Sequence, residues 1–371
     1  MVLTGEEVEE ISKFFTDNAA TGISISPVTD ASGFQGCYYS LHVGRTDSKL
    51  FIKSVPGGDD VVDDFYRRTG IFVKEVAVYR NLLPKMADFG KLWPDCCLAR
   101  EGRYLVLEDM AVSGWRTAST MDEIHVAVAL RGFAKFHASS LSVLDEAENS
   151  VIFSSIAVET MLSTDPESPG RQMWNAFCKF AQETYSAHFP ESDVDVFGVF
   201  QNAIDVVNRE SGFRTCLNHG DPWMNNLLFK YSNNIPTMAS FVDFQSARLA
   251  PPALDVSIFL NIFQPDRVEF LATSIYYDEL SKNLLDREIE VLSRQEFIES
   301  IKYFEKTAKC VASLYIFLTK LPFEYMSKIL VDQKTFIKFA LGQNYSVAWE
   351  ALKSDAEYRN VFLKYLRSAI N

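Results

Sequence analysis

The sequence lacks the closely spaced histidines and cysteines that bind zinc, and none of its six cysteines form a C-x-x-C motif. A zinc site needs several such ligands at short spacing, so none is expected. The N-terminal residues 1–18 combine helical apolar spacing with four glutamates, which is the wrong charge for a signal peptide. Together these features predict reduced thiols in a cytoplasmic protein.

A basic patch and a long apolar run are also missing. The net charge is −13 at pH 7, whereas nucleic-acid backbones are bound by basic surfaces. The most apolar late stretch, residues 311–318, is followed by Lys320 and Pro322 and is too short to cross a bilayer. We therefore expect neither a nucleic-acid partner nor a membrane span.

Two enzyme signatures are absent. No G-x-S-x-G segment marks a hydrolase nucleophile, and no A-P-E segment marks a peptide-binding activation loop. Cys216 lies close to His219, but its apolar flanks predict a strand, and a buried structural cysteine is the more common case. The composition is otherwise that of a globular protein, and its 29 Phe and 15 Tyr predict a large core, with an apolar substrate pocket as the minor alternative.

The most informative stretch is Cys216–Phe229. Its polar residues His219, Asp221 and Asn226, and Asp243 a short loop later, are bracketed by apolar runs. The carboxylates are therefore expected where short buried strands emerge into a cleft. Such a placement is costly unless the carboxylates are paired or hold a metal.

Phosphoryl transfer accounts for this set of residues. Asp221 would accept the proton of an attacking hydroxyl, because an ionised carboxylate only accepts hydrogen bonds. Asn226 and Asp243 would offer one neutral and one charged oxygen to magnesium, and all three form the predicted catalytic set. His219 is predicted to be structural, with its imidazole bonded to the loop backbone.

Upstream residues fit the same chemistry. Lys53 lies on a short apolar strand, and Glu75 follows about twenty residues later on a helix spanning residues 72–83. A strand lysine and a helix glutamate at this spacing suit a pair that orients the lysine toward the α- and β-phosphates. In isolation, Glu75 would be interpreted as an ordinary surface glutamate. Gly33 and Gly36 precede a strand, and they predict either a phosphate-covering loop or a plain hairpin turn.

The apolar strand of residues 103–107 ends at Glu108. In a two-lobed kinase the chain crosses between lobes here, and the backbone of Glu108 to Met110 would bind the adenine edge. Beyond this point the pattern is strongly helical, with breaks near Pro322 and Gly342. Within that region His137 is predicted to pack inside the second lobe, and Asp255 to cap a helix start.

The segments 219–226 (His-Gly-Asp-Pro-Trp-Met-Asn-Asn) and 242–245 (Val-Asp-Phe-Gln) resemble the ecdysteroid kinase-like family, within the aminoglycoside phosphotransferase and choline kinase group. The resemblance runs from about residue 33 to residue 260. It implies an α+β, protein-kinase-like bilobal fold with a small antiparallel-sheet N-lobe and a large, mainly helical C-lobe. We place the nucleotide-binding lobe at residues 1–110 and the catalytic and substrate-binding lobe at residues 111–371.

The resemblance also implies the activity, which is transfer of the ATP γ-phosphate to a small-molecule hydroxyl with Mg²⁺. An ecdysteroid, another sterol-like alcohol or a xenobiotic alcohol is the expected acceptor, and a choline- or aminoglycoside-type substrate is the alternative. Lys53 would match the phosphate-binding lysine, Glu75 its partner, and Asp255 the acid that braces the catalytic loop. No oligomeric state is implied.

The chain departs from the family pattern in two places. Family members usually carry an acidic residue and an asparagine after the second glycine, whereas Gly36 is followed here by Cys37. This departure bears on ATP affinity and favours the alternative of a non-catalytic nucleotide-binding protein. Pro222 replaces a common leucine, which stiffens the loop without removing a chemical group.

Overall fold

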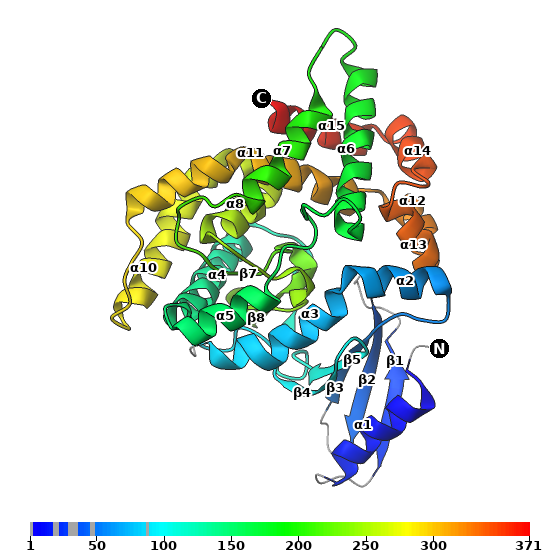
Figure 1. Ribbon diagram of the computed structural model, residues 1–371, viewed down its shortest axis with the longest axis vertical. Helices are drawn as coiled ribbons and strands as arrows, with labels where there is room; N and C mark the ends of the chain where they lie inside the picture. The colour runs from blue at the N-terminus through cyan, green and yellow to red at the C-terminus, as the bar shows by residue number, and fades with distance from the viewer. Residues whose placement is uncertain (1–2, 18–21, 29–35, 45–48, 87–88) are drawn as a thin grey trace.

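The structure is a computed structural model that describes residues 3–17, 22–28, 36–44, 49–86 and 89–371. An antiparallel sheet forms the N-terminal part, and a larger, mainly helical C-terminal part follows (Figure 1). This α+β arrangement confirms the predicted fold class. The lobe boundary at residue 110 stays a prediction, although strand β5 ends at Glu108.

Five antiparallel strands form the N-terminal sheet in the order β1-β2-β3-β5-β4. Their bounds are Ile23–Pro27 (β1), Cys37–Val43 (β2), Lys49–Ser54 (β3), Cys96–Arg100 (β4) and Tyr104–Glu108 (β5). Three helices accompany the sheet: α1 (Gly5–Asp17), α2 (Asp60–Thr69) and α3 (Ile71–Ala77), the last continuing through a π-helical turn (Val78–Leu82) and a 3-10 turn (Leu83–Lys85).

The alternation of side chains along β3 and β5 gives the sheet two different faces. Ile52 and Val106 pack with Ile11 of α1, whereas Leu105 belongs to the large core that contains α3. Because neighbouring residues on a strand point to opposite faces, Lys53 faces away from α1 and toward α3. The alternation of side chains along β3 therefore places Lys53 on the face of the sheet that is covered by α3, the helix that carries Glu75.

The C-terminal part is built from helices around the buried helix α8. The helix bounds are Glu123–Leu144 (α4), Ala147–Ile156 (α5), Pro169–His188 (α6), Val196–Asn208 (α7), Pro252–Phe263 (α8), Val268–Leu271 (α9), Asp278–Leu285 (α10), Arg294–Thr319 (α11), Phe323–Ile329 (α12), Gln333–Ala340 (α13), Ser346–Ser354 (α14) and Ala356–Ile370 (α15). The predicted breaks are confirmed, because α12 begins directly after Pro322 and α13 ends two residues before Gly342.

Two small sheets carry the loops that matter for function. Strand β7 (Cys216–Asn218) pairs with β10 (Arg248–Ala250), and β8 (Leu227–Ser232) lies between β6 (Trp115–Arg116) and β9 (Ile235–Phe241). Short 3-10 turns lie at Met224–Asn226, Phe244–Ser246 and Pro265–Arg267, and a second π-helical turn lies at Ala272–Tyr277. The loops from β7 to β8 and from β9 to β10 thus run close to each other.

The two parts of the chain also meet directly at helices α13 and α2, which lie beside each other in Figure 1. Tyr66 donates a hydrogen bond to Gln333 at 2.7 Å, and Lys334 pairs with Asp59 at 2.9 Å. All six cysteines are free. None of the helices in the described part of the chain is long and apolar enough to cross a membrane, and the cytoplasmic location stays a prediction.

Candidate active site

The loop between β7 and β8 turns sharply at Gly220, directly before Asp221. Gly220 has a φ of 81°, and a Cβ at this position would lie 1.9 Å from the carbonyl oxygen of Ser246. Only glycine fits such a left-handed turn against a neighbouring backbone. The glycine therefore lets the loop lie against the segment after β9.

Asp255 anchors this loop to α8 through hydrogen bonds. Its carboxylate, which is fully buried on α8, accepts hydrogen bonds from the backbone N–H groups of His219 at 2.5 Å and Gly220 at 3.1 Å. The predicted helix cap is wrong, because Asp255 lies inside the first turn and its carboxylate reaches across to the loop. The backbone N–H of Asp255 donates a hydrogen bond to the side-chain oxygen of Asn218 at 3.2 Å.

His219 ties the two functional loops together. Its Nε2 lies 2.9 Å from the carbonyl oxygen of Val242, and its Nδ1 lies 3.3 Å from the backbone N–H of Asp221. A carbonyl can only accept and an N–H can only donate, so these contacts require a neutral ring with its proton on Nε2. The prediction of a structural histidine is confirmed. His137 is also structural, because it is buried and bonds the hydroxyl of Tyr276 at 2.7 Å.

Asp221, Asn226 and Asp243 lie together where the two loops meet. The side-chain nitrogen of Asn226 donates to Asp221 Oδ2 at 2.8 Å and to the Asp221 carbonyl at 3.0 Å. These contacts orient the amide and leave its oxygen as the atom suited to a hard cation. Asp243 has a φ of 68°, a left-handed conformation that is uncommon outside glycine. The backbone N–H of Val242 also bonds the Asn226 carbonyl at 3.1 Å.

These two oxygen donors fit magnesium better than a metal that is held entirely by protein. No group of three or more His, Cys, Asp or Glu suited to a metal occurs among the residues that the structure describes. Mg²⁺ is commonly bound by one or two protein ligands together with substrate phosphates. The pair Asn226 and Asp243 meets that requirement.

Lys53 lies between two carboxylates. Its ammonium nitrogen is 2.8 Å from Glu75 Oε2 and 2.8 Å from Asp243 Oδ1. Glu75 is only 1% exposed, so its interpretation as a surface glutamate is wrong. Burial opposes the charge on Lys53, but Asp243 and Glu75 outweigh it and raise the pKa of the lysine. Lys53 is therefore a fixed cation beside Asp243.

Asp221 is more basic than an exposed aspartate. Burial raises its pKa, and the neighbouring charge of Asp243 adds to this effect. Hydrogen bonds from Tyr315 and Asn226 act in the opposite direction. The hydroxyl of Tyr315 donates to Asp221 Oδ1 at 2.5 Å.

A cavity of about 310 Å³ opens beside Asp221. It is enclosed by α2, the segment from Glu159 to Phe177, α11 and α13, and Asp221, Asn226 and Asp243 lie in its wall. Most of the wall is apolar and aromatic, as shown by Phe65, Met161, Trp174, Phe177, Trp223, Phe317, Phe336 and Phe339. An organic molecule in this cavity would therefore have its reactive group next to the carboxylates.

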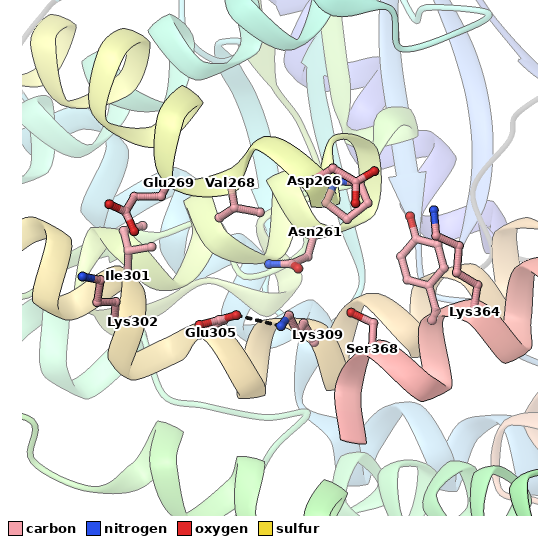
Figure 2. A pocket seen from close by; sticks show the side chains of 12 residues that line it. Asn261, Asp266, Val268, Glu269, Ile301, Lys302, Glu305, Lys309, Lys364 and Ser368 are labelled. Carbon is pink, nitrogen blue, oxygen red and sulfur yellow. Dashed lines mark hydrogen bonds and ion pairs between the residues drawn. The ribbon is translucent and has the colours of Figure 1, made fainter. Parts of the chain in front are cut away.

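A second cavity, of about 390 Å³, is larger but has a different character. Figure 2 shows that it lies among α8, α9, α11 and α15, with Lys302, Glu305 and Lys309 along α11 and Asp266 and Glu269 opposite them. Glu305 and Lys309 pair with each other at 2.7 Å. None of the predicted site residues lines this cavity, so the candidate site is the apolar cavity beside Asp221.

Comparison with known proteins agrees with the motifs from which the site is built. A sequence profile of the ecdysteroid kinase-like family matches residues 40–289, a span that includes Lys53, Asp221 and Asp243. The chain belongs to the ecdysteroid kinase-like family. Family membership and the kinase-like fold together indicate a small-molecule phosphotransferase. No curated protein sequence gives a significant match.

Several solved structures are similar at low identity. A proposed aminoglycoside phosphotransferase from Ralstonia eutropha is 12% identical, with 98% of each chain covered and a TM-score of 0.49. An ethanolamine kinase from Plasmodium vivax is 11% identical, with 93% of this chain and 90% of that chain covered and a TM-score of 0.44. A choline kinase from Cryptosporidium parvum is 12% identical, with 96% and 99% covered and a TM-score of 0.43.

Of the remaining predicted residues of this ecdysteroid kinase-like chain, the structure describes Gly36, Glu108 and Met110. Glu108 ends β5 and pairs with Lys91 at 2.7 Å, and the Met110 carbonyl accepts from two N–H groups of the following turn. Gly36 has a φ of 129° at the start of β2, and Gly33 lies outside the described residues. The expected nucleotide contacts of these four residues stay predictions.

Sequence reasoning missed three residues that shape the site. Tyr315 contacts Asp221, and Arg248 forms a buried ion pair at 2.5 Å with Glu159, a residue of the cavity wall. Lys74 extends from α3 to the carbonyl oxygens of Val158 at 2.9 Å and Ala247 at 3.2 Å. Because Lys74 directly precedes Glu75, its contacts fix α3, the helix whose Glu75 pairs with Lys53. Its position beside Glu75 was the available signal.

Proposed function

We propose that this protein is an ATP- and magnesium-dependent kinase that phosphorylates a hydroxyl of a bulky, largely apolar alcohol. The observation that carries the proposal is the convergence of Lys53, Asp221, Asn226 and Asp243 at one end of an apolar cavity. Positioning and charge stabilisation are what phosphoryl transfer requires of a protein. An alcohol in the cavity would present its hydroxyl to Asp221.

Each side chain has a role in this proposal. Asp221 accepts the proton of the attacking hydroxyl, and its raised pKa makes it a better base than an exposed aspartate. Asn226 and Asp243 would hold magnesium, which would supply positive charge to neutralise the phosphates. Glu75 keeps Lys53 in place, and Lys53 exchanges Asp243 for phosphate oxygens when the nucleotide binds.

The nucleotide is proposed to lie between the sheet and these loops. Gly33 and Gly36 would cover its phosphates, and the backbone of Glu108 and Met110 would contact the adenine. These assignments rest on the order of the elements along the chain. Gly36 directly precedes β2, which pairs with β3, the strand that carries Lys53.

The size and lining of the cavity favour a bulky alcohol over a small cation. A volume of about 310 Å³ lies at the lower end of the range of pockets for drug-sized ligands, roughly 300–1,000 Å³. Aromatic walls also suit a quaternary ammonium group, which makes a choline-type substrate the second candidate. A small ammonium alcohol would leave much of the cavity unfilled. Glu159, an acid in the wall, is already paired with Arg248.

An acceptor panel tests this proposal. We expect magnesium-ATP to phosphorylate sterol-like or other bulky apolar alcohols, with little product from choline, sugars or aminoglycosides, when products are detected by mass spectrometry. Turnover of choline alone would show that the second candidate is right. Absence of any phosphorylated product across the whole panel would count against a kinase, and nucleotide binding without turnover would then identify a non-catalytic binding protein.

The metal assignment can be tested without turnover. We expect ATP with magnesium to raise the melting temperature, because a ligand at ~100 times its Kd stabilises a folded protein by about 2.7 kcal/mol. ATP in the presence of EDTA should give a smaller shift, since the cation that Asn226 and Asp243 would hold is then removed. Asp243→Asn should reduce the difference between the melting-temperature shift with magnesium and the shift with EDTA. Asp266→Asn in the second cavity should leave that difference unchanged. Equal shifts with and without magnesium in the wild type would contradict the assignment.

A further inference from the structure

Both carboxylate oxygens of Asp221 already have a donor from the protein. Asn226 donates to Oδ2 at 2.8 Å, and the hydroxyl of Tyr315 donates to Oδ1 at 2.5 Å. Asn226 belongs to the same loop as Asp221, but Tyr315 comes from α11, 94 residues away. The Tyr315 contact is therefore formed only when the helical part packs against the loop.

The hydroxyl of Tyr315 approaches Asp221 from the side of the acceptor cavity. Tyr315 lines that cavity together with Trp223 and Phe317, and it is 7% exposed. The acceptor alcohol must offer the same group, an O–H donor, to the same carboxylate. Tyr315 thus makes the contact that the proposed acceptor would make.

Burial alone does not require this contact. Tyr303, on the same helix, has a buried hydroxyl with no hydrogen-bond partner among the described residues. A tyrosine hydroxyl on α11 is therefore not always paired with a protein group. Phenylalanine at position 315 would keep the ring in the cavity wall and lose only the donor to Asp221.

A kinase with an exposed base faces a side reaction. If water reaches Asp221, it can attack the γ-phosphorus, forming a new P–O bond while the bond to the ADP oxygen breaks and the water proton passes to Asp221. The products are then ADP and inorganic phosphate, and no alcohol is phosphorylated. Water is far smaller than the alcohol, so the apolar cavity walls do not exclude it by shape.

We propose that Tyr315 is a positioning residue whose hydroxyl holds Asp221 and occupies its Oδ1 until the acceptor alcohol replaces it, which suppresses ATP hydrolysis. This inference rests on the proposed kinase function. It assigns to α11 a role in coupling ATP consumption to alcohol phosphorylation. Without an alcohol the base is occupied by the protein, and with one it is occupied by the substrate.

Tyr315→Phe tests the inference in magnesium-ATP without any alcohol. We expect ADP release to rise by about tenfold, a part of the ~10²–10⁴-fold that a positioned base contributes. The ratio of ADP release without alcohol to transfer onto the best alcohol of the panel should therefore rise. Tyr303→Phe, the matched change on the same helix, should leave that ratio unchanged.

A double variant separates this role from a loosened structure. Because Tyr315 acts through Asp221, the rise in hydrolysis should disappear in Asp221→Asn/Tyr315→Phe. The inference would be overturned by an unchanged ratio of hydrolysis to transfer in Tyr315→Phe, or by a rise in hydrolysis that persists in the double variant. In either case the kinase function would still stand, provided that the wild type phosphorylates an alcohol. If wild type phosphorylates no alcohol and Asp221→Asn leaves ATP turnover unchanged, the kinase function itself fails.

Discussion

Asp221→Asn is expected to lower kcat for alcohol phosphorylation by about 10²–10⁴-fold, which is the contribution of a positioned general base. The substitution keeps the size of the side chain and one oxygen for hydrogen bonding, but it removes the group that takes the proton. KM for the alcohol should change little, because the remaining amide oxygen can still accept a hydrogen bond from the alcohol, whereas the acceptance of the proton is lost. Steady-state rates over a range of alcohol concentrations give both constants.

Stability provides an independent check on this variant. The charge of Asp243 and burial both raise the pKa of Asp221, so the ionised side chain is held at a cost in the folded protein. Asp221→Asn removes that cost, and its melting temperature should equal or exceed that of wild type. Asp266→Asn, the same change in the polar cavity of Figure 2, should leave kcat unaltered. A kcat within about threefold of wild type in Asp221→Asn would exclude Asp221 as a general base.

The part of the site that could be predicted is local in sequence. His219, Asp221 and Asn226 belong to one loop, and their spacing alone indicates their chemistry. Lys53 and Glu75 could be paired because the strand period and the helix period each put one residue on the shared side.

The part that could not be predicted depends on packing between distant segments. Residues 311–318 were seen only as an apolar stretch, and nothing in their spacing indicates that Tyr315 meets Asp221. The cavity wall has the same origin, because α2, α6, α11 and α13 each contribute a few side chains. The role proposed for Asp221 could therefore be predicted from one loop, whereas the cavity that would hold the acceptor depends on packing across the helical part.

Asp255 illustrates how a correct residue can be given the wrong local role. Aspartate near a helix start usually caps that helix, yet here its carboxylate serves the backbone of another loop. Sequence statistics cannot distinguish these cases, since both place an acid in the first turn. The resemblance to the family did distinguish them, because it implies an acid that braces the catalytic loop.

Asp255→Ala is expected to destabilise the protein by about 3–5 kcal/mol, the range for removing one partner of a buried charged network. The N–H groups of His219 and Gly220 would lose their acceptor in a dry environment. Asp255→Asn keeps one acceptor oxygen and should cost less, about 1–3 kcal/mol for the one N–H group left unpaired. Urea midpoints measure both, and Asp205→Ala, at an exposed position on α7, should stay within about 0.5 kcal/mol of wild type.

The effect of Asp255 should also depend on pH with a definite sign. Burial raises its pKa, but the neighbouring His137, whose Nε2 lies 3.6 Å from the carboxylate, and the charge of Arg248 outweigh burial, so the pKa lies below the ordinary value of 3.8. A carboxyl whose pKa is lowered in the folded state contributes stability that is fully present above its unfolded pKa. This stability is lost as the pH falls through the folded pKa. The difference in the free energy of unfolding between wild type and Asp255→Asn should therefore narrow below about pH 4, because asparagine cannot titrate. A difference that widens in acid would mean that Asp255 does not hold the loop as a carboxylate.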